Sequence, residues 1–205
     1  MILSWHGLSC VSLKNRAINI VCDPYDESAG LKLPELKADI VTFSRSDENT
    51  PKSTPEIKVF SWPGEYEAQG VYFEGIFSDE KDGQAVVFKF KANGVDICHL
   101  GMIKEIPGEN VISKIGKVDI LLVPVGGGKV MNAKDAKKII EDTEPAVVVP
   151  IYYATPGVKE KLASLEEALK ELQVKDYQKV DKLDLKKLTL SEGKMEIVVL
   201  EPELA

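Results

Sequence analysis

Two apolar runs separated by a helix-forming segment constrain the fold of this chain more than any other feature. Val118–Val123 and Ala146–Pro150 are apolar almost throughout, as expected for strands that are covered on both faces. Asn132–Asp142, which lies between them, can form a helix. The order of the three segments predicts a strand–helix–strand unit in the second half of the chain.

Two further segments extend this unit. Pro156–Gln173 starts with a proline and carries apolar residues at a helical spacing opposite a charged face, which predicts a helix that packs on the sheet. Met195–Leu200 is another apolar run, long enough for a closing strand. No Ser/Gly-rich linker separates it from the rest, so we expect a single domain over residues 1–205.

Short strand-like runs dominate the first half of the chain. Polar turns at 14–16, 81–83 and 92–94 contain the Asn and Gly residues that hairpins use where the backbone reverses. The expected strands are Met1–Trp5, Ser9–Leu13, Ala17–Cys22, Asp39–Phe43, Lys58–Ser61, Val71–Ile76, Gln84–Lys91 and Val95–His99. Hairpins first and a strand–helix–strand unit later predict an α/β (α+β) fold, with two packed sheets under outer helices.

Composition and charge exclude several classes of protein. Hydrophobic residues make up 44% and charged residues 29% of the chain, an ordinary globular mixture. The net charge is −7 and the lysines are interleaved with acidic residues, so we expect no nucleic-acid partner. No apolar run approaches the ~18 residues of a membrane span, and the N-terminus lacks the features of a signal peptide. We therefore expect a cytoplasmic protein without a membrane partner.

The three cysteines favour packing over chemistry. Cys10, Cys22 and Cys98 each lie in an apolar, strand-like run, where a free cysteine behaves as a small hydrophobe. Cys10 and Cys22 would be diagonal to one another across a hairpin, which disfavours a disulfide. We expect three buried, reduced thiols.

Several stretches resemble the metallo-β-lactamase superfamily, in particular its short bacterial branch of Zn-dependent hydrolases and L-ascorbate-6-phosphate lactonases. Their order and spacing cover the chain nearly end to end, and the resemblance implies a four-layer αββα sandwich. The matching stretches are Trp5–Ser9, Val21–Tyr25, Ala38–Val41 with Ser44, Pro63–Glu67 with Gly70-Val71, Cys98–Gly101, Val118–Gly127 and Val149-Pro150.

The zinc ligands that the resemblance implies are replaced in this chain. If Ser44 is aligned with the serine before the family's HxHxDH motif, Arg45 and Asp47 fall on its first two histidines, Asn49 on its aspartate and Thr50 on its last histidine. The resemblance therefore places non-ligand residues in most of this loop.

The later ligand positions are replaced as well. The family's HD pair falls near Ser78-Asp79, Met102 replaces the aspartate of its HLGD, and Tyr152 replaces the histidine of its Pro-x-His-Tyr. The whole chain has two histidines, His6 and His99, too few for a dinuclear zinc centre. We expect both to be structural and no cofactor to be bound.

Arg45 could supply the positive charge that zinc supplies in the family. Asp23 and Asp47 should both approach the pocket, and a guanidinium can bind a carboxylate through two parallel hydrogen bonds. We therefore hypothesise that Arg45 is a counterion to these carboxylates. Alternatively, Arg45 points outward into solvent.

Two other groups of residues have competing interpretations. Gly126-Gly127-Gly128 could cradle an anion on backbone amides, or could simply form a sharp strand-to-helix turn. The acidic residues Asp23, Asp26, Glu27, Asp47 and Glu48 could hold Mg²⁺ or Ca²⁺, although their spacing fits no calcium loop and a solvated acidic edge explains them better.

The leading prediction is a non-catalytic binding or regulatory module whose partner is a small molecule or a protein, with a homo-oligomer as a further option. A first alternative is a hydrolase or lactonase of the same fold that uses a non-standard divalent site. A second is a purely structural protein whose apolar surface joins subunits. The residues expected to line the cleft are Asp23, Arg45, Asp47, Asn49, Thr50, Ser78, Met102 and Tyr152.

Overall fold

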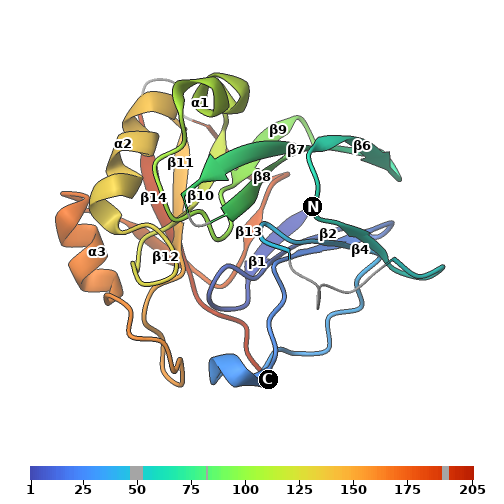
Figure 1. The fold of residues 1–205 in the computed structure, drawn as a ribbon, viewed down its shortest axis with the longest axis horizontal. Helices are drawn as coiled ribbons and strands as arrows, with labels where there is room; N and C mark the ends of the chain where they lie inside the picture. The colour runs from blue at the N-terminus through green and yellow to red at the C-terminus, as the bar shows by residue number, and fades with distance from the viewer. Residues whose placement is uncertain (47–52, 82, 191–193) are drawn as a thin grey trace.

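The strands form two sheets that pack against each other (Figure 1). The structure is a computed structural model that describes residues 1–46, 53–81, 83–190 and 194–205. The six-stranded sheet contains, in spatial order, β13 (Leu183–Asp184), β1 (Ile2–Trp5), β2 (Val11–Lys14), β3 (Asn19–Cys22), β4 (Ile40–Thr42) and β5 (Lys58–Phe60). Antiparallel hairpins join β1 to β2 and β2 to β3, while β3, β4 and β5 are parallel.

The second sheet has eight strands, and it combines a long meander with a parallel half. Its spatial order is β12 (Gln178–Val180), β14 (Glu196–Leu200), β11 (Val147–Ile151), β10 (Ile120–Pro124), β9 (Val95–His99), β8 (Gly83–Ala92), β7 (Val71–Glu80) and β6 (Gly64–Ala68). The strands β6 to β9 pair antiparallel, and β9, β10, β11, β14 and β12 pair parallel. The parallel half contains the predicted strand–helix–strand unit.

The α-helices of the described residues lie on the eight-stranded side of the molecule (Figure 1). They are α1 (Glu109–Ile115), α2 (Ala133–Thr143) and α3 (Leu165–Glu171). Helix α1 contacts β7, and α2 contacts β10 and both other helices. Asn132 caps α2 by accepting a hydrogen bond from the Asp135 amide, which satisfies a backbone donor at the start of the helix. No helix in the described ranges is long and apolar enough to cross a membrane.

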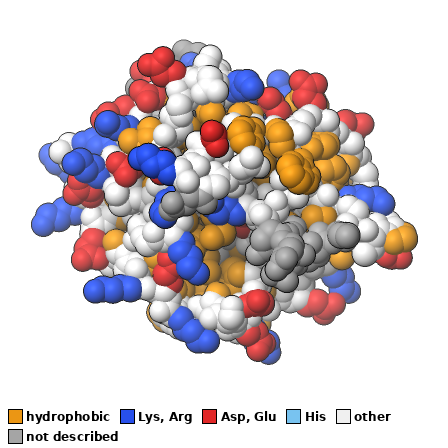
Figure 2. Space-filling model, in the orientation of Figure 1, with side chains coloured by type: hydrophobic (Ala, Val, Ile, Leu, Met, Phe, Trp, Pro, Cys, Tyr) orange, Lys and Arg blue, Asp and Glu red, His pale blue; other side chains and the backbone are white. Residues whose placement is uncertain are grey.

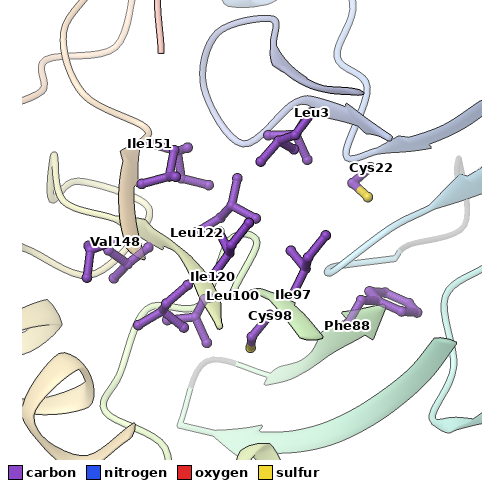
Figure 3. Close-up of a cluster of buried hydrophobic side chains, with 14 of the residues drawn as sticks. Leu3, Cys22, Phe88, Ile97, Cys98, Leu100, Ile120, Leu122, Val148 and Ile151 are labelled. Atoms are coloured by element: carbon purple, nitrogen blue, oxygen red, sulfur yellow. The ribbon is translucent and has the colours of Figure 1, made fainter. Parts of the chain in front are cut away.

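The main core fills the space between the two sheets. Figure 3 shows side chains of both sheets converging there, with Leu3 and Cys22 on one side and Phe88, Ile97 and Leu122 on the other. All five are at most 1% exposed. Cys10, Cys22 and Cys98 are buried free thiols, as predicted.

The predicted strands are confirmed to within a few residues, but two segments differ. A helix over Pro156–Gln173 is wrong, because α3 spans only Leu165–Glu171 and begins at a capping box formed by Ser164 and Glu167. Gly157 has a φ of +97°, which a right-handed helix does not tolerate. The edge strand β6 at Gly64–Ala68 is not among the expected strands.

The parallel strands of both sheets end at the same side of the sandwich. The chain leaves β3 at Asp23, β4 at Phe43, β9 at Leu100, β10 at Val125 and β11 at Tyr152. In open α/β sheets ligands bind at the carboxyl ends of the strands. We therefore expect a binding site among the segments that follow these strands.

Candidate functional site

A cleft of about 560 Å³ lies at the carboxyl ends of these strands. Its walls come from segments that are far apart in the sequence, and three of the predicted cleft residues, Asp23, Met102 and Tyr152, line it together. The face shown in Figure 2 has hydrophobic side chains in its lower centre, with charged side chains around them. The lining is Leu8, Ser9, Asp23, Pro24, Tyr25, Asp26, Ser28, Ala29, Phe43, Met102, Lys129, Tyr152, Val158, Lys159 and Glu160.

Asp23 is held rigidly at the floor of this cleft. Its Oδ1 accepts a hydrogen bond from the Ser44 amide at 2.6 Å and its Oδ2 accepts one from Ser44 Oγ at 2.7 Å. Ser44 Oγ also accepts a bond from the Met102 amide at 2.9 Å. One serine thus connects the ends of β3, β4 and β9. Burial raises the pKa of the Asp23 carboxyl above its usual value, because the charged form loses water.

His99 lies behind Asp23 in the interior. The Nε2 of His99 is 3.0 Å from the Ser9 carbonyl oxygen, which can only accept, so Nε2 carries the proton of the neutral ring. Its Nδ1 lies 4.0 Å from Asp23 Oδ2 and has no hydrogen-bond partner within the described part of the chain. Burial lowers the pKa of His99. The imidazole is therefore neutral, with one nitrogen lone pair facing the carboxylate.

A glycine allows the loop after β9 to approach this network. Gly101 has a φ of +62°, and a Cβ at this position would lie 2.2 Å from Ser44 Cβ and 2.9 Å from Asp23 Oδ2. Any side chain here would collide with both residues. The glycine is thus required by the close packing of the loop on Asp23 and Ser44.

Arg45 pairs with Glu80, a carboxylate that was not among the predicted cleft residues. Its Nη2 donates to Glu80 Oε2 and its Nε donates to the Met102 carbonyl at 3.0 Å. Glu80 Oε1 accepts from the amides of Lys104 at 2.8 Å and Glu105 at 3.2 Å. The pair therefore connects the segment after β4, the end of β7 and the loop after β9. The counterion hypothesis named Asp23 and Asp47. The structure shows Arg45 paired with Glu80, and Asp47 lies outside the described residues.

Two cleft residues have strained backbones and contact each other. Leu8 has a φ of +47° and Tyr152 a φ of +54°, and the Tyr152 amide donates to the Leu8 carbonyl at 2.9 Å. Asp23 is similar, with a φ of +45°. Residues other than glycine seldom adopt this region, and such strain clusters at functional sites.

The glycine turn after β10 holds a carboxylate of the same chain. Lys129 donates its amide to Glu160 Oε1 at 2.9 Å, and Tyr152 Oη donates to Glu160 Oε2 at 3.0 Å. Burial raises the pKa of Tyr152 above its usual range, so its hydroxyl keeps the proton that it donates. The sequence offered two interpretations of Gly126–Gly128, a turn and an anion cradle. The Gly127 amide donates to the Met131 carbonyl at 3.1 Å, as in a turn, and the amide that holds Glu160 is that of Lys129, the next residue along the chain.

The remaining predicted residues divide into two groups. Ser78 is buried on β7, on the same face as Glu80, and does not line the cleft around Asp23. Asp47, Asn49 and Thr50 lie outside the described residues. Glu80 and Glu160 were missed, and the only sequence signal for Glu80 is its place directly after Ser78-Asp79.

The described donors do not fit the zinc cage that the fold implies. Among the residues that the structure describes, no group of three or more His, Cys, Asp and Glu could hold a metal ion. His6 uses both ring nitrogens elsewhere, with Nδ1 3.2 Å from the Glu203 carbonyl oxygen and Nε2 2.8 Å from Ser12 Oγ. In the described ranges, Asp23 and His99 remain as two neighbouring donors, fewer than the three protein ligands of a catalytic zinc.

Comparisons with known proteins agree with this fold. The solved structure of a Thermotoga maritima protein, named as a Zn-dependent hydrolase of the metallo-beta-lactamase superfamily, matches with a TM-score of 0.81 and 30% identity over 97% of each chain. A UPF0173 protein of Pyrococcus furiosus is 24% identical over 84% of this chain and 91% of its own length. A UPF0173 metal-dependent hydrolase of Lysinibacillus sphaericus is 24% identical over 76% of this chain and 86% of its own.

The profile of a protein family also matches this chain. Residues 2–152 match the profile described as Beta-lactamase superfamily domain, and they include every strand from β1 to β11 together with Asp23, Ser44 and Tyr152. With two packed sheets and a cleft at the carboxyl ends of their parallel strands, the chain belongs to the metallo-β-lactamase superfamily.

Proposed function

We propose that this chain is a non-catalytic member of its superfamily that binds a small molecule in the cleft floored by Asp23. The observation that carries the proposal is the ion pair between Arg45 and Glu80. This ion pair lies between segments that, by the resemblance, align with the loops that hold zinc in the family.

The ion pair connects these segments without an ion. Arg45 occupies the position aligned with the first histidine of the motif, and Met102, whose carbonyl accepts from Arg45, occupies the position aligned with a later aspartate. Glu80 completes the connection by accepting two backbone amides of the loop after β9. Charge-assisted hydrogen bonds of this kind are roughly twice as strong as neutral ones. The guanidinium of Arg45 therefore supplies positive charge to these loops, and its contacts hold the loops together.

The small number of histidine side chains supports the same proposal. The chain has two histidines. Both ring nitrogens of His6 have hydrogen-bond partners, and so does Nε2 of His99. Because zinc sites of this superfamily are built mainly from histidine, a single remaining nitrogen is a weak basis for one.

The cleft itself favours binding. It has strained residues at Leu8, Asp23 and Tyr152 and a mixture of apolar walls and a few polar groups, which is typical of small-molecule sites. Strain of this kind persists only where the surrounding structure holds it in place. In a protein that had kept only the fold and no binding site, we would not expect this backbone strain to persist.

Metal content and turnover test the proposal. Protein purified without chelators should contain well under one equivalent of zinc, manganese or iron by mass spectrometry. Adding these ions should leave the melting temperature unchanged, whereas a ligand present at ~100 times its Kd would stabilise the fold by about 2.7 kcal/mol. Stoichiometric metal together with hydrolysis of a phosphodiester or lactone would contradict the proposal. Asp23→Asn is the control that links any such activity to the cleft.

A second candidate is a metal-dependent hydrolase with a non-standard site. The relatives named metal-dependent hydrolases favour it. So does Nδ1 of His99, which lies 4.0 Å from Asp23 Oδ2 and has no hydrogen-bond partner among the described residues. If this candidate is correct, His99→Gln should remove bound metal, whereas His6→Gln should not.

A further inference from the structure

Residues 154–163 form a strap along one side of the cleft. The Ala154 amide donates to the Ala163 carbonyl at 2.9 Å, and the Ala163 amide donates to the Gly126 carbonyl at 2.9 Å, so both ends of the strap are fixed beside β11. Its far part reaches the loop after β3, where the Lys159 amide donates to the Ala29 carbonyl at 3.0 Å. Compact loops with joined ends are frequently functional.

The strap places one carboxylate on the glycine turn. Glu160 accepts from the Lys129 amide at 2.9 Å and from Tyr152 Oη at 3.0 Å. Gly128 has a φ of +70°, and a Cβ there would lie 2.6 Å from Glu160 Oε1. The absence of a side chain at Gly128 is what lets an anion come this close to the backbone.

These donors are not specific for Glu160. An amide N–H and a phenol O–H can serve any carboxylate or phosphate oxygen. The side chains of Lys129 and Lys159 add positive charge at the same rim of the cleft. Tyr152 is 2% exposed, so its hydroxyl belongs to a fixed and largely dehydrated part of the wall. Glu160, in contrast, is partly exposed and could leave into solvent.

We infer that Glu160 occupies, from within the chain, the binding site for the acidic group of the cleft ligand, and that the ligand displaces it. The inference rests on the proposed function, because it names the class of molecule that the cleft takes. Tyr25, Phe43 and Val158 line the same cleft and offer apolar contact. The ligand is therefore a small organic anion with an apolar body and a terminal carboxylate or phosphate.

An apolar body is needed because the internal carboxylate competes. A tethered group has an effective concentration of about a millimolar or more. If Glu160 fills the site about 90% of the time, it weakens the binding of any other anion about tenfold. Bare acetate should therefore bind poorly, while hexanoate gains from the apolar walls.

Removal of Glu160 tests the inference. Hexanoate, acetate, monobutyl phosphate and inorganic phosphate are titrated into the wild type and Glu160→Ala, with the Lys129 amide followed by NMR. We expect Glu160→Ala to bind hexanoate or monobutyl phosphate about tenfold more tightly, with the largest shift at Lys129. The tighter of the two assigns the acidic group. Adding Tyr152→Phe should weaken that binding roughly threefold or more.

Glu171→Ala is the matched control, since Glu171 is an exposed glutamate at the end of α3 and its loss should leave all four affinities unchanged.

Equal affinities in the wild type and Glu160→Ala, or no response of Lys129 in either protein, would overturn the inference. If Glu160→Ala does not fold, the wild type decides: saturating hexanoate or monobutyl phosphate must shift Lys129 together with the strap amides. Metal and turnover assays test the proposed function separately, so the two can fail independently.

Discussion

Arg45 and Glu80 form an ion pair between the segment after β4 and the end of β7, and the side chain of Glu80 is 1% exposed. Removing one partner of a buried pair leaves the other charge uncompensated and costs about 3–5 kcal/mol. We expect Arg45→Met to lower the free energy of unfolding by about 3 kcal/mol, measured by urea denaturation.

The double variant separates the charge from the packing. Glu80→Gln keeps an acceptor for the Lys104 and Glu105 amides but removes the charge. Arg45→Met combined with Glu80→Gln should therefore be more stable than Arg45→Met alone. A loss below about 0.5 kcal/mol in the single variant, as is typical of exposed pairs, would show that the pair does not hold these loops together.

Gly101 and Gly94 allow a matched test of the packing around Asp23. Both have a positive φ, +62° and +78°, but a Cβ at Gly101 would overlap Ser44, whereas a Cβ at Gly94 meets nothing within 4 Å. Each change to alanine incurs about 1–2 kcal/mol of backbone strain, and overpacking adds about 1–3 kcal/mol at Gly101 alone. Gly101→Ala should therefore lower the melting temperature clearly more than Gly94→Ala. Equal shifts would mean that the loop after β9 can move away from Asp23 at little cost.

The two histidines should make the fold sensitive to mild acid. Burial lowers the pKa of His6 and of His99 below the ordinary value of 6.5, so below pH 6.5 the unfolded chain binds protons that the folded chain does not. Stability is therefore lost as the pH falls through this window, at up to about 1.4 kcal/mol per pH unit for each histidine.

A His6 variant isolates one of these protons. His6→Asn should be less stable near pH 7, because it loses the contact with Ser12, but its stability should fall less steeply below pH 6.5. Comparison with the wild type removes the contribution of other groups, including Asp23, whose raised pKa acts in the opposite direction. Identical slopes in the two proteins would mean that the pKa of His6 is the same in the folded and the unfolded chain.

Much of the fold could be predicted because its strands have clear patterns. Val95–His99 is a strand over the same residues as predicted. Asp23, Met102 and Tyr152 could be brought together by the resemblance, because each follows a strand that ends at one side of the sandwich. Local sequence was sufficient wherever an apolar run alone decided the structure.

The errors arose where tertiary contacts override local pattern. Val158 and Leu162 have a helical spacing, yet they lie in the strap, where Val158 lines the cleft and Leu162 packs near Gly126. The pairing of Arg45 with Glu80 could not be predicted either, because the two residues are 35 positions apart and no periodicity relates them. The place of Glu160 in the cleft could not be predicted for the same reason.

Asp23 provides the most discriminating substitution in the cleft. Asparagine keeps an acceptor for the Ser44 amide, tolerates the left-handed backbone at a φ of +45°, and could donate to the bare Nδ1 of His99. Alanine does none of these things. We expect Asp23→Asn to change the free energy of unfolding at pH 7 by less than about 1 kcal/mol, and Asp23→Ala to lower it by about 2–4 kcal/mol.

The pH dependence of the Asp23→Asn effect follows from the raised pKa of the Asp23 carboxyl. Between its ordinary value of 3.8 and its folded value, the folded chain holds a proton that the unfolded chain has released. The wild type therefore loses stability as the pH rises through this window, whereas Asp23→Asn does not. The difference between the two proteins should move in favour of Asp23→Asn from pH 3.5 upward and become constant above the folded pKa. If it moves the other way, the hydrogen bonds from Ser44 stabilise the carboxylate more than burial destabilises it, and the pKa of Asp23 lies below its ordinary value in the folded chain.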